Sequence, residues 1–261
     1  MNNDFFFLSI FQGIAEFLPI SSNGHLVILE KLFNIKSGGF ETHVALHFGS
    51  LFALFIYFFK DIFLMIFSLL GKNSKHINNN KQYRDLSFTL IIASFPAMLV
   101  GFLIKKFFGI TSESFKIIAI ASIVFGILLI LADTNPVKDR FINYKRGILI
   151  GICQCLAFIP GASRSGVCIT AARFFGMSRI EATRFSFLMA IPTILGASTL
   201  VLFEASDVKS LFTVSQIIMM GITAGFGILT IQILLWFVNK FGFFHFGIYR
   251  ILFGLFILCF L

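Results

Sequence analysis

Long runs of uncharged, apolar residues recur along this sequence and limit what it can fold into. Six runs approach about 20 residues, the length that a helix needs to cross the hydrocarbon core of a bilayer. They are Thr42–Phe59, Leu86–Ile104, Ile117–Ala132, Phe185–Phe203, Ser210–Asn239 and Phe241–Leu261. The pattern predicts an all-α polytopic membrane protein with six spanning helices.

Composition agrees with this interpretation. Hydrophobic residues make up 57% of the chain and charged residues only 13%, about half the usual charged share of a soluble domain. Disorder, a disulfide scaffold, a coiled coil and an ordinary cytosolic enzyme are excluded. The net charge of +9 comes from basic residues in short loops between the apolar runs, where they meet anionic lipid headgroups. We therefore expect the bilayer, and no nucleic acid, as a partner.

Two further apolar runs, 5–20 and 147–160, are too short to span a bilayer. Each contains a polar side chain and ends in a proline followed by a turn of Ser and Gly residues. Unwound backbone is tolerated at membrane depth only where it is buried in protein or lines a wet cavity. Both runs are therefore predicted to be re-entrant segments.

The two short runs also resemble each other. The residues at 13–16 read Gly-Ile-Ala-Glu and those at 151–154 read Gly-Ile-Cys-Gln. We predict one membrane domain over 1–261 that contains an internal duplication, with repeats at about 1–135 and 140–261. Each repeat has one re-entrant segment and three spans, so the second should be inverted relative to the first. The basic loops 60–85 and 133–146 are assigned to the cytoplasm, and the two turns should meet near the midplane.

The first turn carries polar groups that are costly inside a membrane. Gln12 and Glu16 are four residues apart and share one helix face. Glu16 is either a metal ligand, an acid/base group or half of a structural ion pair. Ser22 and His25 either form a nucleophile–base pair or belong to a helix start that Ser21 or Ser22 caps.

The second turn has the parts of a phosphate cradle. Residues 160–166 supply the hydroxyls of Ser163 and Ser165, the guanidinium of Arg164, and N–H groups freed by glycines such as Gly161. The alternative, which is compatible with the first, is an ion pair between Arg164 and Glu16 that joins the two halves.

Three further polar residues lie inside apolar runs, and each allows two interpretations. His43 and His47 are four residues apart, but two histidines without a third ligand are weak support for a metal site, so we expect helix packing. Arg250 lies inside the last apolar run and either snorkels or reaches the polar centre.

Both motifs resemble the signatures of a known family. The run from Gln12 to His25 is similar to the first signature of the undecaprenyl-diphosphate phosphatases of the bacitracin-resistance type, with Asn23 where that family usually has Thr. The run 160–166 resembles their second signature, Pro-Gly-x-Ser-Arg-Ser-Gly. Gln154, the stretch 185–192 and Tyr249-Arg250 match as well, so the resemblance covers nearly the whole chain.

The resemblance implies a multi-pass enzyme of the bacterial cytoplasmic membrane. It would hydrolyse undecaprenyl diphosphate to undecaprenyl phosphate and phosphate, which recycles the lipid carrier of peptidoglycan synthesis and confers bacitracin resistance. It also implies a divalent cation, Mg²⁺ or Ca²⁺, and a site that opens to the outer face. A homodimer is one expected state of assembly. The competing class is a transporter or flippase of a polyprenyl phosphate lipid, because inverted repeats with broken helices are common there.

The resemblance also implies roles for the polar residues. The catalytic groups would be Glu16, Ser22, His25 and Arg164, with Ser22 or a water attacking and His25 acting as acid/base. Glu16 and Gln12 would hold the cation. Substrate-binding roles would fall to Ser21, Asn23, Gly161, Ser163, Ser165 and Arg250.

Overall fold

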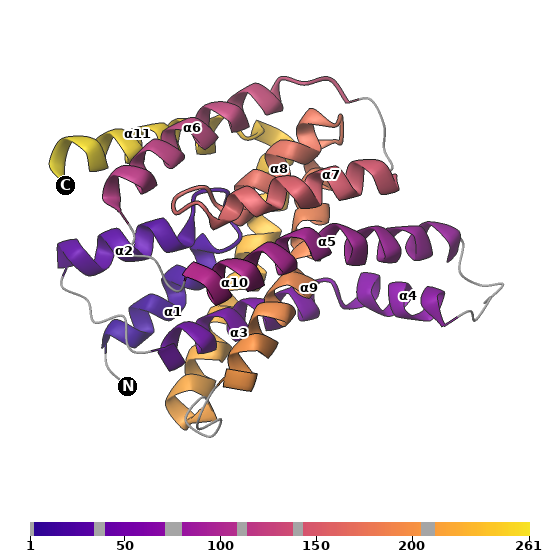
Figure 1. Cartoon of the computed structure of the whole chain (residues 1–261), viewed down its shortest axis with the longest axis horizontal. Helices are drawn as coiled ribbons and strands as arrows, with labels where there is room; N and C mark the ends of the chain where they lie inside the picture. Colours follow the sequence, from indigo (N-terminus) through magenta and orange to yellow (C-terminus); the bar gives the residue numbers. More distant parts are fainter. Residues whose placement is uncertain (1–2, 34–39, 71–79, 109–113, 138–142, 205–211) are drawn as a thin grey trace.

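The computed structural model describes residues 3–33, 40–70, 80–108, 114–137, 143–204 and 212–261, and within them the chain is helical without strands (Figure 1). The first half contains α1 (Asn3–Ala15), α2 (Ser22–Phe33), α3 (Phe40–Tyr57), α4 (Phe59–Leu69), α5 (Asn80–Phe108) and α6 (Phe115–Asp133). The second half contains α7 (Tyr144–Gln154), the 3-10 turn η1 (Cys155–Phe158), α8 (Arg164–Phe174), α9 (Arg179–Glu204), α10 (Val214–Phe241) and α11 (Phe244–Phe260).

Four of the described helices are long and apolar enough to cross a membrane. They are Lys81–Phe107, Phe115–Asp133, Arg179–Leu200 and Val214–Phe241. A bent pair, α3 with α4, brings the number to five if it counts as one span. The prediction of an all-helical, multi-pass membrane protein is confirmed at this level.

Two of the six predicted spans differ from simple helices. The run 42–59 does not continue straight, because α3 ends at Tyr57 and the chain bends by 76° into α4. Phe58 lies at this bend with its ring buried, 6.4 Å from the ring of Phe187. The last run forms α11, which has 17 residues and is shorter than the other candidates.

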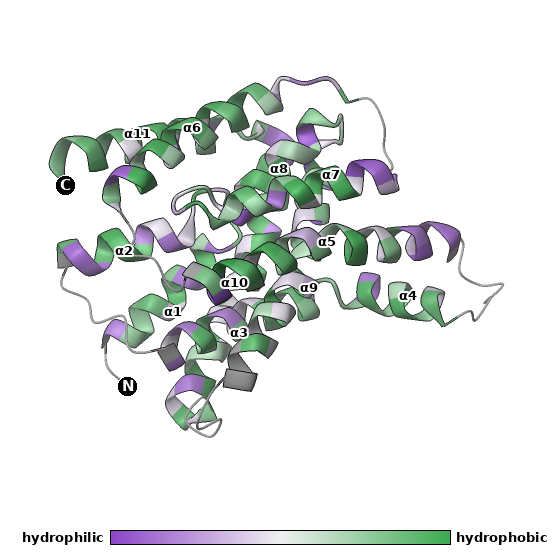
Figure 2. Cartoon of the chain, in the orientation of Figure 1, coloured by the Kyte–Doolittle hydropathy of each residue, from purple (hydrophilic) through white to green (hydrophobic). Residues whose placement is uncertain are grey.

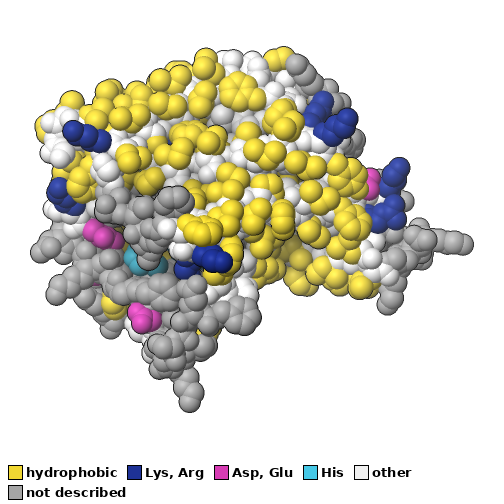
Figure 3. Space-filling view, in the orientation of Figure 1, with side chains coloured by type: hydrophobic (Ala, Val, Ile, Leu, Met, Phe, Trp, Pro, Cys, Tyr) yellow, Lys and Arg dark blue, Asp and Glu magenta, His cyan; other side chains and the backbone are white. Residues whose placement is uncertain are grey.

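The outer surface is apolar along the long helices. Large hydrophobic side chains are exposed on α5, α6, α10 and α11. Figure 2 shows that the long helices consist mainly of hydrophobic residues, and Figure 3 shows hydrophobic side chains over much of one face of the molecule. Lys and Arg side chains gather mainly towards the ends of these helices (Figure 3). A continuous apolar face of this size is typical of a surface that meets lipid rather than water.

The two short helices that precede the turns pack in corresponding ways. Helix α1 packs against α10, and α7 packs against α5. Gly13 makes the first contact close, because a Cβ there would lie 2.7 Å from the carbonyl oxygen of Thr223. Gly151 does the same in the second, where a Cβ would lie 2.0 Å from the carbonyl oxygen of Ala93. These glycines allow both helices to approach a long neighbour and carry the turns into the protein.

Candidate active site

Two unwound turns with the same local geometry meet in the centre of the protein. Ser21 and Ser163 stand directly before α2 and α8 with φ of 75° and 69°, in the left-handed region. The Ser21 hydroxyl accepts from the N–H of Gly24 at 3.4 Å, and the Ser163 hydroxyl accepts from the N–H of Gly166 at 3.2 Å. Positive φ at a non-glycine residue costs about 1–3 kcal/mol and is concentrated at functional sites. The sequence left open whether Ser21 or Ser22 caps the helix start, and in the structure Ser21 caps α2.

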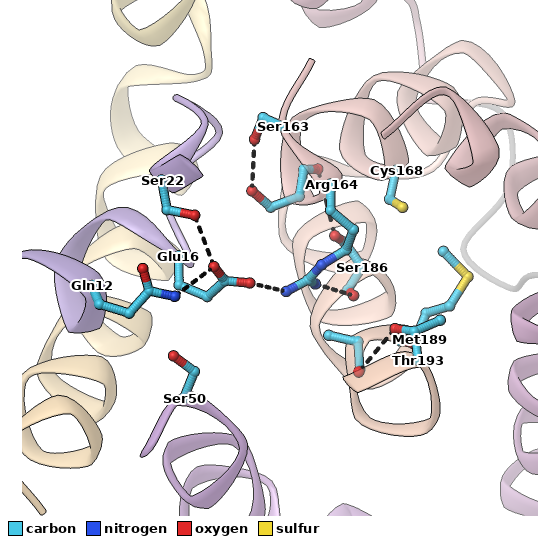
Figure 4. A network of polar contacts seen from close by, with 12 residues as sticks. Gln12, Glu16, Ser22, Ser50, Ser163, Arg164, Cys168, Ser186, Met189 and Thr193 are labelled. Atoms are coloured by element: carbon cyan, nitrogen blue, oxygen red, sulfur yellow. Dashed lines mark hydrogen bonds and ion pairs between the residues drawn. The ribbon is translucent and has the colours of Figure 1, made fainter. Parts of the chain in front are cut away.

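An ion pair joins the two turns. Glu16, just after α1, and Arg164, the first residue of α8, approach with 3.0 Å between Oε1 and Nη2 (Figure 4). The side chains are only 11% and 17% exposed, so each charge depends on the other for compensation. Nη1 of Arg164 also donates to the carbonyl of Ser186 at 3.4 Å. The expected pairing of the two halves through these residues is present.

The other carboxylate oxygen of Glu16 gathers the polar groups of the first turn. Its Oε2 accepts from Nε2 of Gln12 at 3.0 Å and from the hydroxyl of Ser22 at 2.8 Å. Ser50 of α3 lies beside this group in Figure 4. The spacing of Gln12 and Glu16 thus places both on one face, as predicted, and the fold adds Ser22 to them.

The hydroxyls of the second turn attach it to the first. Ser165 donates to the carbonyl of Leu18 at 3.0 Å and lies 3.2 Å from the hydroxyl of Ser163. Ser186 of α9 donates to the carbonyl of Ser165 at 3.5 Å. Ser163 and Ser165 therefore lie beside Arg164 but are engaged with protein groups.

His25 and Ser22 are not in contact, so the predicted nucleophile–base pair is not formed in this structure. Nδ1 of His25 lies 2.8 Å from the carbonyl of Ser21, and Nε2 lies 2.7 Å from the hydroxyl of Tyr249. The buried ring stacks on Phe253 with 3.8 Å between the ring centroids. Ser22 begins α2 and faces Glu16, whereas His25 packs towards α11.

Arg250 reaches the polar centre rather than snorkelling. Its side chain is fully buried in α11. Nη1 donates to the carbonyl of Pro19 at 3.1 Å, and Nη2 donates to the carbonyls of Gly161 and Ala162 at 2.9 and 2.8 Å. Carbonyls in unwound backbone have lost their helical partners and need new ones. Arg250 therefore holds both turns by their backbones, and direct contact with substrate stays a prediction.

Gly161 and Asn23 occupy different environments. Gly161 has φ of 90°, and a Cβ there would lie 2.5 Å from the carbonyl oxygen of Ile118, so the turn requires glycine at this point. Asn23 lies in the first turn of α2 and is exposed.

A cavity of about 700 Å³ opens beside the ion pair. Its polar wall contains Glu16, Arg164, His43, His47, Lys105 and Gln154. The rest is mainly apolar and includes Ala97, Met98, Phe102, Phe158, Ile194 and Leu200. A pocket lined by charged and by apolar side chains suits a ligand that has both a charged and an apolar part.

The position of His43 and His47 corrects one expectation. Both were assigned to helix packing, but both line the cavity, and the ring of His47 is exposed there. Their spacing of four residues was the signal, because it places them on one helix face. Ser50 and Ser186 were missed, since a single serine in an apolar run carries no functional pattern.

The donor set of the first turn fits a hard divalent cation. Oε1 of Gln12 is buried and makes no hydrogen bond to any described residue. Together with the Glu16 carboxylate and the Ser22 hydroxyl, it offers oxygen ligands, which Mg²⁺ and Ca²⁺ prefer. Within the described part of the chain, no group of three or more His, Cys, Asp or Glu side chains is arranged to hold a metal. A cation here would therefore need further oxygens, such as those of a phosphate.

Fold and site together define a class: a polytopic helical membrane protein with an acid, hydroxyls and a guanidinium buried beside an apolar cavity. The chain belongs to the family described as bacitracin resistance protein BacA, whose model matches residues 5–256. An undecaprenyl-diphosphatase of Pelagibacter ubique is 38% identical over 252 residues, which cover 94% of this chain and 92% of that protein. An undecaprenyl-diphosphatase of Saccharophagus degradans is 38% identical over 254 residues, covering 95% and 94%. The family resemblance found in the two motifs is confirmed.

Proposed function

We propose that this protein is an undecaprenyl-diphosphate phosphatase that releases phosphate from the lipid and leaves undecaprenyl phosphate. Membership of the BacA family and the two related diphosphatases support this activity. The observation that carries it structurally is the contact of the Glu16 carboxylate with Ser22 and with Arg164, where Glu16 and Arg164 line the cavity. The proposal includes the recycling of the carrier of peptidoglycan synthesis and the resistance to bacitracin that the family name describes.

Phosphoryl transfer depends mainly on positioning and on neutralising charge, and the two turns provide both. Arg164 would hold phosphate oxygens with its planar guanidinium, which suits two parallel hydrogen bonds. The N-terminus of α8 behind it favours an anion as well. Ser163 and Ser165 support this turn through the contacts with Leu18 and with each other. Ser22 lies on the opposite side of the ion pair, where it or a water would attack.

A divalent cation would be held by Glu16 and Gln12. When bound, it supplies positive charge that neutralises the phosphate oxygens in the transition state. The unpartnered Oε1 of Gln12 supports this assignment. Glu16 would then be shared between the cation and Arg164, and Ser22 would keep its place beside the carboxylate.

The apolar wall of the cavity would receive the first part of the prenyl chain. Burying apolar surface contributes about 25 cal/mol per Å², so even a few isoprene units provide substantial binding energy. Side chains of α5 and α9 supply most of this wall. The diphosphate would then lie against Glu16 and Arg164 while the tail continues along helices that meet lipid.

The topology is part of the proposal. We infer two inverted repeats in one membrane domain, at about 1–135 and 140–261, each with a re-entrant segment followed by three crossings. The matched geometry of Ser21 and Ser163 and the matched packing of Gly13 and Gly151 support the duplication. The bent pair α3–α4 and the short α11 would each count as one crossing. We place the protein in the bacterial cytoplasmic membrane with the site open to the outer face, and a homodimer would be tested by sizing in detergent.

The decisive experiment is phosphate release from undecaprenyl diphosphate by the purified protein in detergent micelles. The proposal predicts stoichiometric release of phosphate and undecaprenyl phosphate by the wild type, and at most residual release by Arg164→Ala. Movement of the lipid across liposomes without any phosphate release would instead favour a transporter or flippase. No release under any cation condition would contradict the proposed activity.

A further inference from the structure

The cavity contains an imidazole that is placed for proton transfer, that of His47 on α3. Nδ1 of His47 lies 2.8 Å from the carbonyl of His43. A carbonyl only accepts hydrogen bonds, so Nδ1 of the neutral ring carries the proton and Nε2 carries the lone pair. Within the described part of the chain, Nε2 makes no hydrogen bond, and the ring is exposed to the cavity.

His47 shares this wall with the charged pair that would bind the diphosphate. Glu16 and Arg164 line the same cavity, and the His47 ring interacts electrostatically with the Glu16 carboxylate. His47 therefore lines the same cavity as the pair that would bind the diphosphate.

Two other candidate bases, Glu16 and His25, are already engaged. Glu16 accepts from Gln12 and Ser22 and is paired with Arg164. His25 is buried, with one ring nitrogen on the Ser21 carbonyl and the other on the Tyr249 hydroxyl. A general base needs an available lone pair within reach of the proton that it removes. His47 meets this condition, whereas His25 would first have to leave its packing.

We propose that His47 is the general base that activates the hydrolytic water, an inference that rests on the proposed phosphatase function. The water oxygen forms a bond to phosphorus, and one water proton passes to Nε2 of His47. The bond from phosphorus to the leaving oxygen breaks, and its electron pair stays on that oxygen. In direct hydrolysis the leaving oxygen is the one that bridges the two phosphorus atoms of undecaprenyl diphosphate, and it stays on the undecaprenyl phosphate product. In a covalent route it is Oγ of a phosphorylated Ser22, and His47 acts in the second step.

The test must keep the charges around His47 unchanged. The titratable and charged groups that face it are Glu16 after α1, Lys105 on α5, Arg164 on α8, and His43 one turn away on α3. His47→Gln preserves polarity and approximate size but has no basic nitrogen. His245→Gln on α11 is the matched control, since His245 is exposed and packs only on aromatic rings of α10 and α11 among the described residues.

The experiment is phosphate release from undecaprenyl diphosphate in detergent, with kcat and KM measured for each variant. His47→Gln should lose about 10²-fold or more in kcat, in the range attributed to a general base, with little change in KM. His245→Gln should keep the activity of the wild type. Added imidazole should restore part of the activity of His47→Ala.

The assignment would be overturned if kcat of His47→Gln stayed within about threefold of the wild-type value. If His47→Gln unfolds in detergent, absence of imidazole rescue in a folded His47→Ala contradicts the proposal equally. The wild-type measurement stands apart from these comparisons, because a wild type without activity contradicts the phosphatase function itself. The ratio of variant to wild type, and the rescue by imidazole, report on His47.

Discussion

The first and second turns have one backbone design and opposite chemistry. In both, a short helix ends, the chain unwinds, and a serine with positive φ accepts a hydrogen bond from a glycine three residues later. The residue directly after this serine begins the next helix, and there the two turns differ. It is Ser22 in the first turn and Arg164 in the second. The same backbone conformation therefore presents a hydroxyl in the first turn and a guanidinium in the second.

The same contrast holds at the residues that precede the two turns. Glu16 and Gln154 follow corresponding glycines, but only Glu16 carries a charge. Glu16 pairs with Arg164, whereas the amide oxygen of Gln154 accepts from the thiol of Cys168 at 3.5 Å. If the two turns were chemically equal, the centre would hold like charges that repel. Their divergence lets one acid and one base neutralise each other and leaves a site for an anionic substrate.

The largest effect is expected at the residue that distinguishes the first turn. Ser22→Ala should lower single-turnover phosphate release by about 10³-fold, as expected for removal of a nucleophile. Ser21→Gly should lose far less activity, because glycine tolerates the positive φ and the hydroxyl makes a hydrogen bond of 3.4 Å to the N–H of Gly24. A search for a phosphorylated Ser22 peptide accompanies the assay. A tenth or more of wild-type turnover in Ser22→Ala would favour direct attack by water.

The corresponding change in the second turn is Arg164→Lys. We expect a loss of about 10²-fold, because an ammonium is a point charge and cannot replace a planar fork that contacts both Glu16 and Ser186. Arg184→Lys controls for the chemical change, since Arg184 pairs with Asp61 at a more exposed position. Normal turnover of a well-expressed Arg164→Lys protein would remove the guanidinium from substrate binding.

The cation should depend on the first turn alone. Excess chelator should abolish phosphate release, and Mg²⁺ or Ca²⁺ should restore it. Glu16→Gln should raise the cation concentration for half-maximal activity by about tenfold or more, while Glu30→Gln on α2 should leave it unchanged. Full activity in excess chelator would exclude the cation from the reaction.

The smallest effect concerns His25, the one imidazole of the first turn. Tyr249→Phe removes the hydroxyl that lies 2.7 Å from Nε2 of His25. Loss of one such hydrogen bond costs about 1 kcal/mol of folding stability, which a thermal melt in detergent would detect. If His25 acts mainly by packing, kcat should stay within about threefold of the wild type. A large loss of kcat with unchanged stability would return His25 to a catalytic role.

Much of the fold follows from the sequence because lipid imposes simple rules. Apolar runs of spanning length predicted the helical, multi-pass architecture, and the early prolines located both turns. The bend at Phe58 was not visible, because no proline or glycine marks it and the buried ring that accompanies it packs on distant Phe187. Periodicity reports local preference, whereas such a bend depends on tertiary packing.

The site residues could be predicted where a charged side chain lies inside an apolar, membrane-embedded segment. Glu16 and Arg164 were identified because an intramembrane charge needs a partner, and they were expected to find each other. The neighbours of Ser22 and His25 could not be read from their spacing, since their side chains turn to α1 and α11 respectively. Arg250 was recognised as unusual, but its three carbonyl partners come from two turns that only the folded chain brings together.

The central claim, that the two turns form one chemical unit, is tested most directly by combining variants across them. Phosphate release is measured at saturating cation for Glu16→Gln, for Arg164→Lys and for the double variant. Groups that act as a unit are strongly non-additive, so the double variant should lose about as much activity as the worse single variant. Losses that multiply would mean that Glu16 and Arg164 act independently and would contradict the account.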